Sequence, residues 1–500
     1  MSELVGGQVA VAAPHPAAVQ AAREVVAGGG NAIDAALAAA AALTVAYPHQ
    51  CSVGGDLVAV VRPPDGAARV VLSVGAAAAA TDVPALRAGG SRMPGGGPQT
   101  VTVPGVVAGW AAIARLGARL GLARLLAPAV ALARHGVPVS EGLHRATHSA
   151  LDRVRADPGL SALLLAVDGG PLPVGATLRQ PALADTLETI TADRDAFYRM
   201  LADGLRRFGS PLTMDDFARH RAEVLAPLRA TVDGVTWAAA PPPTQGATLL
   251  AIVGTRSPEL LRVAKQARLR RDALLGDPRT GPVDLDGLLR RADCDVTALP
   301  SAPKPAGDTV AVTAVGADGV AISLIQSVFQ SFGSGLLEPA TGAVLHNRGS
   351  AFSLDPAHPG RIQPGSRPPH TLCPTLATTD DTVLALGCQG GRSQPWILAQ
   401  VAGDLLDAAD PHAVLARPRW VIGERDLGRT HPSLVLEPGV PDADALSATA
   451  HELGLRVAEV AGLHDDAGHV QVARLRGSTL DAASDVRADG LAAVLGPPAS

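Results

Sequence analysis

A proline-rich break two thirds of the way along the chain limits the folds that it can adopt. Residues Ala298 to Asp308 contain three prolines and have no hydrophobic period, so they favour neither a helix nor a strand. Two strand-like runs follow at once, over 309–316 and 320–328, and the turn sequence Ala317-Asp318-Gly319 separates them. The sequence therefore predicts a linker, then a hairpin that begins at Thr309, and it divides the chain into portions 1–308 and 309–500.

The rest of the chain mixes helical and strand patterns. Pro16 to Ala27 is predicted to be a helix closed by glycines, and Asn31 is predicted to cap a second helix that ends before Pro48. Residues 106–136 have a helical pattern, and a strand over 383–387 precedes a helix over 393–406. The pattern alone indicates a mixed α and β protein.

A basic helix is predicted within the segment 257–308 that ends the first portion. Ser257 reads as its N-cap, Pro258 as its first-turn proline and Glu259 as an acid favoured by the helix dipole. We interpret its cations as a solvated face. They are Arg262, Lys265, Arg268, Arg270 and Arg271.

Composition favours a soluble enzyme. The 500 residues are 47% hydrophobic, which allows a large core, and the net charge of −5 gives no reason to expect a nucleic-acid partner. The apolar run 32–47 is too short to span a membrane and contains Asp34, so no membrane partner is expected. The first residues have no basic stretch typical of a signal peptide, and a cytoplasmic location is expected.

Thr309 has the position of a nucleophile that forms by self-cleavage. A hydroxyl needs an adjacent base, and an N-terminal residue carries one in its α-amino group, whose pKa is about 7.7–8.0. Cleavage between Asp308 and Thr309 would thus place nucleophile and base in one residue. The alternative is that Thr309 only begins an edge strand after a linker, and the local pattern by itself favours that alternative.

A series of short motifs along the whole chain resembles the γ-glutamyltranspeptidases, a family of N-terminal-nucleophile hydrolases. In chain order these motifs are Gly29-Gly30-Asn31, Tyr47-Pro48, Gly54-Gly55-Asp56, Thr102-Val103-Pro104-Gly105, Gly109-Trp110, Phe197-Tyr198-Arg199, Pro242-Pro243-Thr244-Gln245-Gly246, Phe332-Gly333-Ser334-Gly335, Asn347-Arg348-Gly349, Gly390-Gly391, Ala483-Ser484-Asp485 and Asp489-Gly490. The resemblance implies an α+β fold of the four-layer αββα sandwich type. It also implies cleavage between Asp308 and Thr309 into two fragments that form one unit, and a mechanism without a metal or other cofactor. The chain looks most similar to the cytoplasmic transpeptidase-like branch that includes oxamate amidohydrolase.

The resemblance also assigns catalytic residues. It makes Thr309 the nucleophile and Ser327 the hydroxyl that orients it. Gly390 and Gly391 match the glycine pair whose backbone amides stabilise the oxyanion. Glycine suits that role because a side chain would obstruct the approach to the tetrahedral intermediate.

The substrate pocket departs from that of true transpeptidases. The positions that hold the glutamyl group there correspond to Ser73-Val74-Gly75, Phe329, Arg348 with Ala351, and His370-Thr371. Ala351 removes an acid that would bind a substrate ammonium, whereas Arg348 adds a group that binds carboxylates.

We therefore expect an amide substrate that carries a carboxylate and needs no α-amine. The residues predicted to bind it are Asn347, Arg348, Phe329, His370 and Thr371. Arg348 is equally consistent with a structural ion pair, and His370 with a buried structural histidine.

Two other groups of residues could carry chemistry. His464, Asp465, Asp466 and His469 could bind a metal but fit a polar turn better. Cys51, Cys294, Cys373 and Cys388 have no CxxC spacing, and free buried thiols are expected.

The sequence thus predicts a self-processing amidohydrolase or acyltransferase that acts through a Thr309 acyl-enzyme, with water or an amine as acceptor. Two alternatives remain. One is a true γ-glutamyl transferase or glutathione hydrolase, and the other is a non-catalytic relative that never cleaves.

Overall fold

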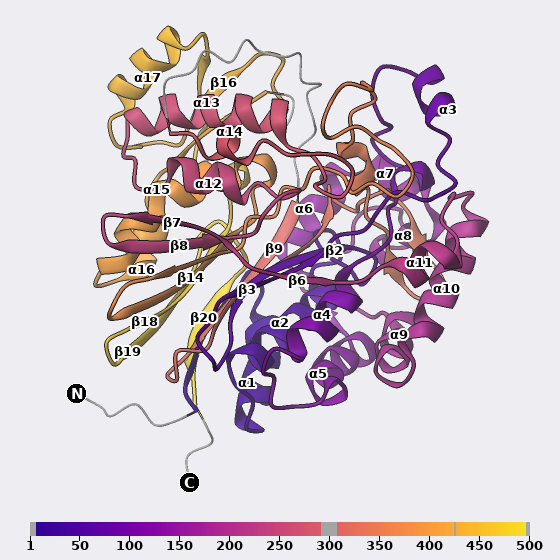
Figure 1. The fold of residues 1–500 in the computed structure, drawn as a ribbon. Helices are drawn as coiled ribbons and strands as arrows, with labels where there is room; N and C mark the ends of the chain where they lie inside the picture. The colour runs from indigo at the N-terminus through magenta and orange to yellow at the C-terminus, as the bar shows by residue number, and fades with distance from the viewer. Residues whose placement is uncertain (1–6, 292–307, 425–426, 497–500) are drawn as a thin grey trace.

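The computed structural model describes residues 7–291, 308–424 and 427–496. Two antiparallel sheets pack face to face, and helices cover the outer side of each (Figure 1). This is the four-layer αββα arrangement, so the α+β class and the layer order that the resemblance implied are confirmed.

The first sheet has seven strands and combines segments from both sides of the proline-rich break. In spatial order they are β20 (Leu491–Leu495), β1 (Val9–Ala13), β9 (Asp308–Gly316), β10 (Ala321–Phe329), β2 (Asp56–Arg62), β3 (Arg69–Ser73) and β6 (Glu223–Leu225). The hairpin predicted after the break is β9 and β10, with Val315 opposite Ala321. It lies in the middle of the sheet, because β1 flanks β9 and β2 flanks β10.

The second sheet has six strands, again from both portions of the chain. They are β19 (Thr479–Ser484), β18 (Val470–Arg476), β14 (Thr382–Cys388), β13 (Thr375–Thr378), β8 (Val235–Ala239) and β7 (Leu228–Val232). Aliphatic side chains such as Val58, Ala311, Ile325 and Ala385 fill the space between the sheets. An interface of alanine and valine lets two sheets approach closely, which agrees with an aromatic content of 2%.

Helices form the outer layers. Over the first sheet and beside it lie α1 (Pro16–Ala27), α2 (Ala32–Ala46), α4 (Val106–Ala114), α5 (Leu122–His135), α6 (Glu141–Ser149), α7 (Leu151–Ala156), α8 (Pro158–Leu164), α9 (Pro181–Ala192) and α10 (Arg194–Arg207). Over the second sheet lie α12 (Gly246–Ile252), α13 (Glu259–Leu274), α14 (Leu285–Leu289), α15 (Gln394–Asp407), α16 (Pro411–Leu415) and α17 (Ala443–Glu452). A smaller sheet of β15 (Trp420–Gly423), β16 (Ser433–Leu436) and β17 (Arg456–Glu459) adjoins this layer.

The helix that the sequence predicted after Asn31 is α2, which is buried along its whole length. Asn31 Oδ1 accepts hydrogen bonds from the backbone N–H groups of Ile33 and Asp34, and the Asp34 carboxylate accepts one from Asn31 N–H in return. This capping box satisfies backbone donors at a helix end that has no access to water.

Two local predictions, on Ser257 and on the basic face of α13, were wrong, and the helical prediction over 106–136 was confirmed except for the loop 115–121. Residues 106–136 form two helices, because Gly117 (φ 135°) turns the chain and the Asp34 carboxylate accepts hydrogen bonds from Arg119 and Leu120 N–H in the connecting loop. Ser257 does not cap α13, since its hydroxyl accepts a hydrogen bond from Trp420 Nε1 instead. The basic face of α13 is not wholly solvated.

On the basic side of helix α13, Arg270 and Arg271 are only 3% and 4% exposed.

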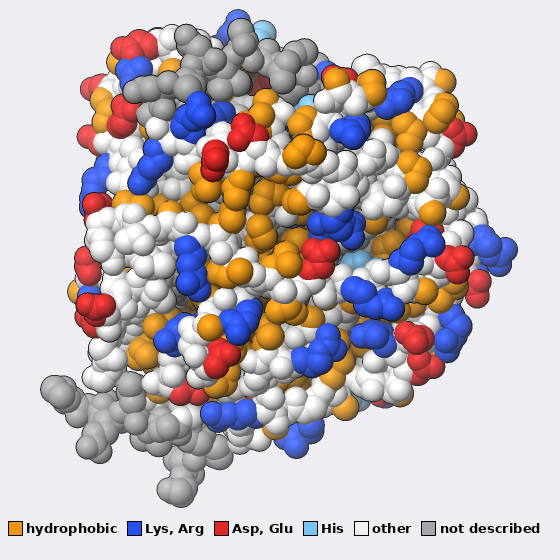
Figure 2. Space-filling model, in the orientation of Figure 1, with side chains coloured by type: hydrophobic (Ala, Val, Ile, Leu, Met, Phe, Trp, Pro, Cys, Tyr) orange, Lys and Arg blue, Asp and Glu red, His pale blue; other side chains and the backbone are white. Residues whose placement is uncertain are grey.

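On the molecular surface seen in Figure 2, basic and acidic side chains are interspersed. Among the described residues, no helix is both long enough and apolar enough to cross a membrane.

Candidate active site

Thr309 is the second residue of β9 and its side chain is buried. Its Oγ1 donates a hydrogen bond to Ser327 Oγ on the neighbouring strand β10, at 3.1 Å. Ser327 Oγ also accepts a hydrogen bond from the backbone N–H of Phe329, at 2.8 Å. The two hydroxyls that the sequence paired are thus in contact, and a backbone donor fixes the second one.

The strand next to Thr309, β10, is irregular near its end. The β9–β10 register shifts between Gln326 and Phe329, and Phe329 has a φ of 81°, which side chains other than glycine rarely adopt. Strained backbone of this kind persists only when its surroundings fix it, and it concentrates at functional sites. Here it turns the Phe329 ring under a buried arginine.

That arginine is Arg348, the first residue of the 3-10 helix η2 (Arg348–Ala351). Its guanidinium carbon lies 3.8 Å from the centroid of the Phe329 ring, and its Nη2 donates a hydrogen bond to Thr371 Oγ1 at 3.2 Å. Its Nε and Nη1 have no hydrogen-bond partner among the described residues. Burial lowers the pKa of Arg348 to about 9, although the charge of Asp56 opposes this shift.

A buried carboxylate lies on the same side of the sheet. Asp56, which is opposite Ser327 in the β2–β10 register, has one oxygen 3.1 Å from His370 Nε2 and 3.4 Å from His346 Nδ1. Burial by itself would raise the pKa of Asp56, but the two histidines hold it well below its usual range.

His370 is neutral at pH 7, because burial and the charge of Arg348 lower its pKa to about 3. Its Nε2 hydrogen points to the Asp56 carboxylate. This geometry favours the structural role that the sequence left open for His370, although the residue also lines the cavity described below.

The glycine pair lies where β14 ends and the layer of outer helices begins. Gly390 (φ 141°) and Gly391 (φ 51°) precede α15, and a Cβ on Gly390 would be 2.6 Å from Ile397 Cδ1. Neither amide nitrogen of the pair donates a hydrogen bond to another described residue. A turn with two unused N–H groups can stabilise an oxyanion.

A small cavity of about 30 Å³ lies beside these elements, although Thr309, Ser327, Arg348 and the glycine pair are not among its lining residues. Its wall includes Phe329, His370, Thr371, Arg392, Arg271 and Asp272. The carboxylate of Asp272 is paired with both Arg271 and Arg392, so the wall has an excess of positive charge. Arg348 adds a further positive charge next to the wall, because it contacts the Phe329 ring and the Thr371 hydroxyl.

Asn347 has a different environment from the other predicted substrate-binding residues. Its Nδ2 donates hydrogen bonds to Gly95 O at 2.8 Å and to Gln330 Oε1 at 2.6 Å, which uses both of its hydrogens. Its Oδ1 accepts a hydrogen bond from Gln330 N–H at 3.2 Å. Asn347 therefore holds the loop after β10, and its contact with substrate remains a prediction.

Two residues of the site were missed as functional candidates. Gln245 was noted only as part of a motif, and Arg271 was interpreted as solvated, yet both are buried and line the cavity. No periodicity could have identified them, because Thr371 and Arg392, to which they respectively donate hydrogen bonds, lie more than a hundred residues further along the chain. The only sequence feature that pointed to either residue was the proline-rich motif that contains Gln245.

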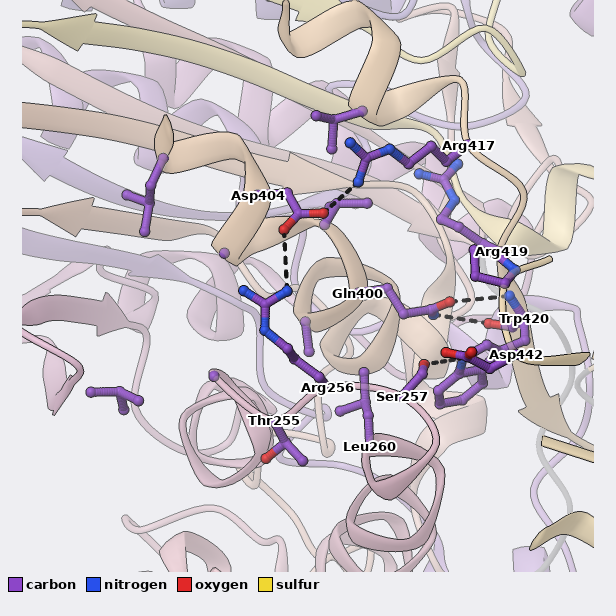
Figure 3. A pocket seen from close by; sticks show the side chains of 18 of the residues that line it. Thr255, Arg256, Ser257, Leu260, Gln400, Asp404, Arg417, Arg419, Trp420 and Asp442 are labelled. Carbon is purple, nitrogen blue, oxygen red and sulfur yellow. Dashed lines mark hydrogen bonds and ion pairs between the residues drawn. The ribbon is translucent and has the colours of Figure 1, made fainter. Parts of the chain in front are cut away.

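The remaining candidates lie outside this site. His469 contacts Asp465 and His464 caps a short turn, and no cluster of three metal-ligating side chains occurs in the described part of the chain. Cys51, Cys373 and Cys388 are free and buried, as expected, whereas Cys294 lies outside the described residues. A larger cavity of about 530 Å³ near α15 shares no lining residue with the one at Thr371 (Figure 3).

Comparison with known proteins identifies the family. A family profile described as gamma-glutamyltranspeptidase matches residues 18–495. The chain belongs to the γ-glutamyltranspeptidase family.

Several relatives of this γ-glutamyltranspeptidase family member span nearly the whole chain. It is 38% identical to the oxamate amidohydrolase proenzyme of Klebsiella pneumoniae, over 96% of this chain and 97% of that one. It is 31% identical to the acylase ACY 1 proenzyme of Pseudomonas sp. strain V22, over 97% and 93%. The crystal structure of cephalosporin acylase from Bacillus halodurans superposes with a TM-score of 0.85 at 31% identity, covering 99% of this chain and 97% of that one. These relatives support hydrolase activity and maturation from a proenzyme.

Proposed function

We propose that this protein is a self-processing amidohydrolase that uses Thr309 as an N-terminal nucleophile on a small amide carrying a carboxylate. The observation that carries the proposal is the contact between Thr309 Oγ1 and Ser327 Oγ, two residues before Phe329, whose ring packs against a buried arginine with unused donors. Names of similar proteins, an oxamate amidohydrolase and two acylase types, support the same class of reaction.

Maturation is the first step of the proposal. Thr309 Oγ1 attacks the carbonyl carbon of Asp308, and the Thr309 nitrogen takes the proton as the peptide bond becomes an ester. Water then opens the ester, leaving a carboxylate on Asp308 and a free α-amino group on Thr309. The fragments 1–308 and 309–500 stay together, because both sheets contain strands from each of them.

Turnover uses the same atoms. The Thr309 amine accepts the hydroxyl proton as Oγ1 attacks the substrate amide, and the N–H groups of Gly390 and Gly391 stabilise the oxyanion that forms. The amine of the substrate leaves with a proton from the Thr309 ammonium, and an acyl ester remains. Water, or an amine acceptor, then releases the acyl group and restores the hydroxyl.

The cavity explains the choice of substrate class. Its wall has excess positive charge, and Arg348 has two donors that no described residue uses, so a carboxylate would satisfy a buried cation. A volume of about 30 Å³ favours a small acyl group. Among the described residues of this wall the single acid, Asp272, is already paired with arginines, so these residues offer a substrate ammonium no free carboxylate.

The decisive experiment is a denaturing gel combined with ammonia release from oxamate. Wild-type protein is expected to give two fragments, with Thr309 at the N-terminus of the smaller one, and Thr309→Ala is expected to stay intact and inactive. Thr313→Ala is the matched control, because Thr313 is a buried threonine on the same strand whose hydroxyl has no partner in the described structure. Cleavage that persists in Thr309→Ala would refute the assignment of the nucleophile. Turnover of γ-glutamyl-p-nitroanilide instead of oxamate would indicate γ-glutamyl transfer.

A further inference from the structure

A buried glutamine connects the two sides of the cavity. Gln245 lies between β8 and α12, and its side chain is 1% exposed. Its Nε2 donates one hydrogen bond to Thr371 O at 2.6 Å and another to Gly391 O at 2.9 Å. Both hydrogens of the side-chain amide are therefore used, one on each of two loops that are distant in sequence.

Arg271 on α13 fixes the orientation of this amide. Its Nη1 donates to Gln245 Oε1 at 2.7 Å and to Arg392 O at 2.7 Å, and its guanidinium lies 5.5 Å from the centroid of the Trp396 ring. An arginine can only donate hydrogen bonds, so the oxygen of Gln245 must face it. The nitrogen of Gln245 must then face the two carbonyls.

The two carbonyls belong to the two functional parts of the site. Gly391 contributes one of the N–H groups available for the oxyanion, and the Gln245 bond fixes the peptide that follows it. Thr371 receives the hydrogen bond from Arg348, the proposed carboxylate-binding residue. One side chain thus sets the distance between the place where the amide reacts and the place where its carboxylate binds.

We infer that Gln245, held by Arg271, is a positioning residue for acyl transfer, an inference that rests on the proposed function. Both residues precede Asp308, whereas Thr371 and Gly391 follow it. After cleavage, the Gln245 contacts join the large fragment to the small one at the reaction centre. The large fragment therefore keeps the small fragment's site in its working geometry through the hydrogen bonds of the Gln245 amide.

Gln245→Glu tests this role, because the two side chains have nearly the same shape. The carboxylate still accepts a hydrogen bond from Arg271, but it can donate to neither carbonyl. We expect the kcat for ammonia release from oxamate to fall on the order of 10- to 100-fold, as for a displaced catalytic group, while KM changes by a smaller factor.

Gln400→Glu is the matched control. Gln400 Nε2 donates to Trp396 O at 2.9 Å and to Trp420 O at 3.0 Å, and its Oε1 accepts from Trp420 N–H at 3.1 Å. Figure 3 shows this amide against Trp420, beside the larger cavity. The substitution removes the same kind of bridge from a place that does not line the Thr371 cavity, and kcat should be unchanged.

Three outcomes are informative. The positioning role is supported if kcat falls in Gln245→Glu but not in Gln400→Glu, and if the two variants have the same thermal melting temperature. Equal kcat values in wild type, Gln245→Glu and Gln400→Glu overturn it while leaving the proposed function intact, provided that Thr309→Ala is inactive. Activity that survives in Thr309→Ala, or no ammonia release by the wild type, overturns the proposed function and the inference with it.

Discussion

Replacing Arg348 by methionine should separate substrate binding from the stability of the fold. The guanidinium is buried over Phe329 and uses only one of its donor groups on a described residue, Thr371. Methionine has a similar length and no charge, so it can fill the space without leaving a large cavity. The change removes the donors that we assign to the substrate carboxylate.

The expected loss of binding follows from those donors. A hydrogen bond to a charged group contributes about 1.5–3 kcal/mol, and about 1.4 kcal/mol corresponds to a factor of ten. Arg348 Nε and Nη1 together should therefore account for on the order of 100-fold or more in kcat/KM for oxamate. The neutral analogue oxamide, which has a carboxamide in place of the carboxylate, should lose only a few-fold.

The stability of Arg348→Met should move in the opposite direction. Burial lowers the pKa of Arg348 from its usual high value to about 9, which corresponds to on the order of 5 kcal/mol against the charged form. Loss of the contact with Phe329 costs about 1–2 kcal/mol, and loss of the Thr371 hydrogen bond costs about 1 kcal/mol. The melting temperature of the variant should therefore equal or exceed that of the wild type.

The assay compares ammonia release from oxamate and oxamide, in wild type and Arg348→Met, with thermal melting in parallel. The reasoning is refuted if both substrates lose activity by the same factor. It is also refuted if the variant melts well below the wild type, because Arg348 would then be a structural residue.

Two further predictions concern the glycine turn and the buried histidines. Gly390→Ala should lower kcat by on the order of 100-fold, since a Cβ there meets Ile397 Cδ1 and the φ of 141° is strained; Gly403→Ala, in open space on α15, is the control and should retain full activity. Burial lowers the pKa of four histidines to about 3 or 4, whereas their pKa in the unfolded chain is 6.5. Between these pH values the four imidazoles are neutral in the folded state and protonated in the unfolded state. They are His15, His49, His220 and His370. At pH 5 unfolding should take up about four protons, and the melting temperature should fall as the pH drops from 6.5 toward 4; a melting temperature that stays constant over that range would contradict the assignment.

Local sequence was sufficient where the determining interactions are local. The hairpin after the proline-rich break was confirmed, because two runs rich in β-branched residues on either side of an Asp-Gly turn strongly favour a β-hairpin. Asn31 was predicted as a cap for the same reason, since its capping partners, Ile33 and Asp34, follow within three residues. The order of the motifs indicated the family and, through it, the αββα layers and the contact of Thr309 with Ser327.

Contacts between distant segments could not be predicted in this way. The sequence could not distinguish a structural His370 from a pocket donor, because that depends on whether Asp56, far away in the chain, lies beside it. It could not decide whether Arg348 has an acidic partner, and in the described structure its nearest contacts are an aromatic ring and a hydroxyl.

Arg271 illustrates the physical reason. A helix rich in arginine is normally solvated, because burying a cation costs several kcal/mol unless specific partners surround it. One of those partners, Asp272, is the next residue on α13, but the others, Gln245, the Arg392 carbonyl and the Trp396 ring, reach α13 only when the second sheet and its outer helices are assembled. The sequence by itself determined the kind of fold and led us to propose Thr309 as the nucleophile, and the tertiary structure decided which buried charges and amides form the candidate site.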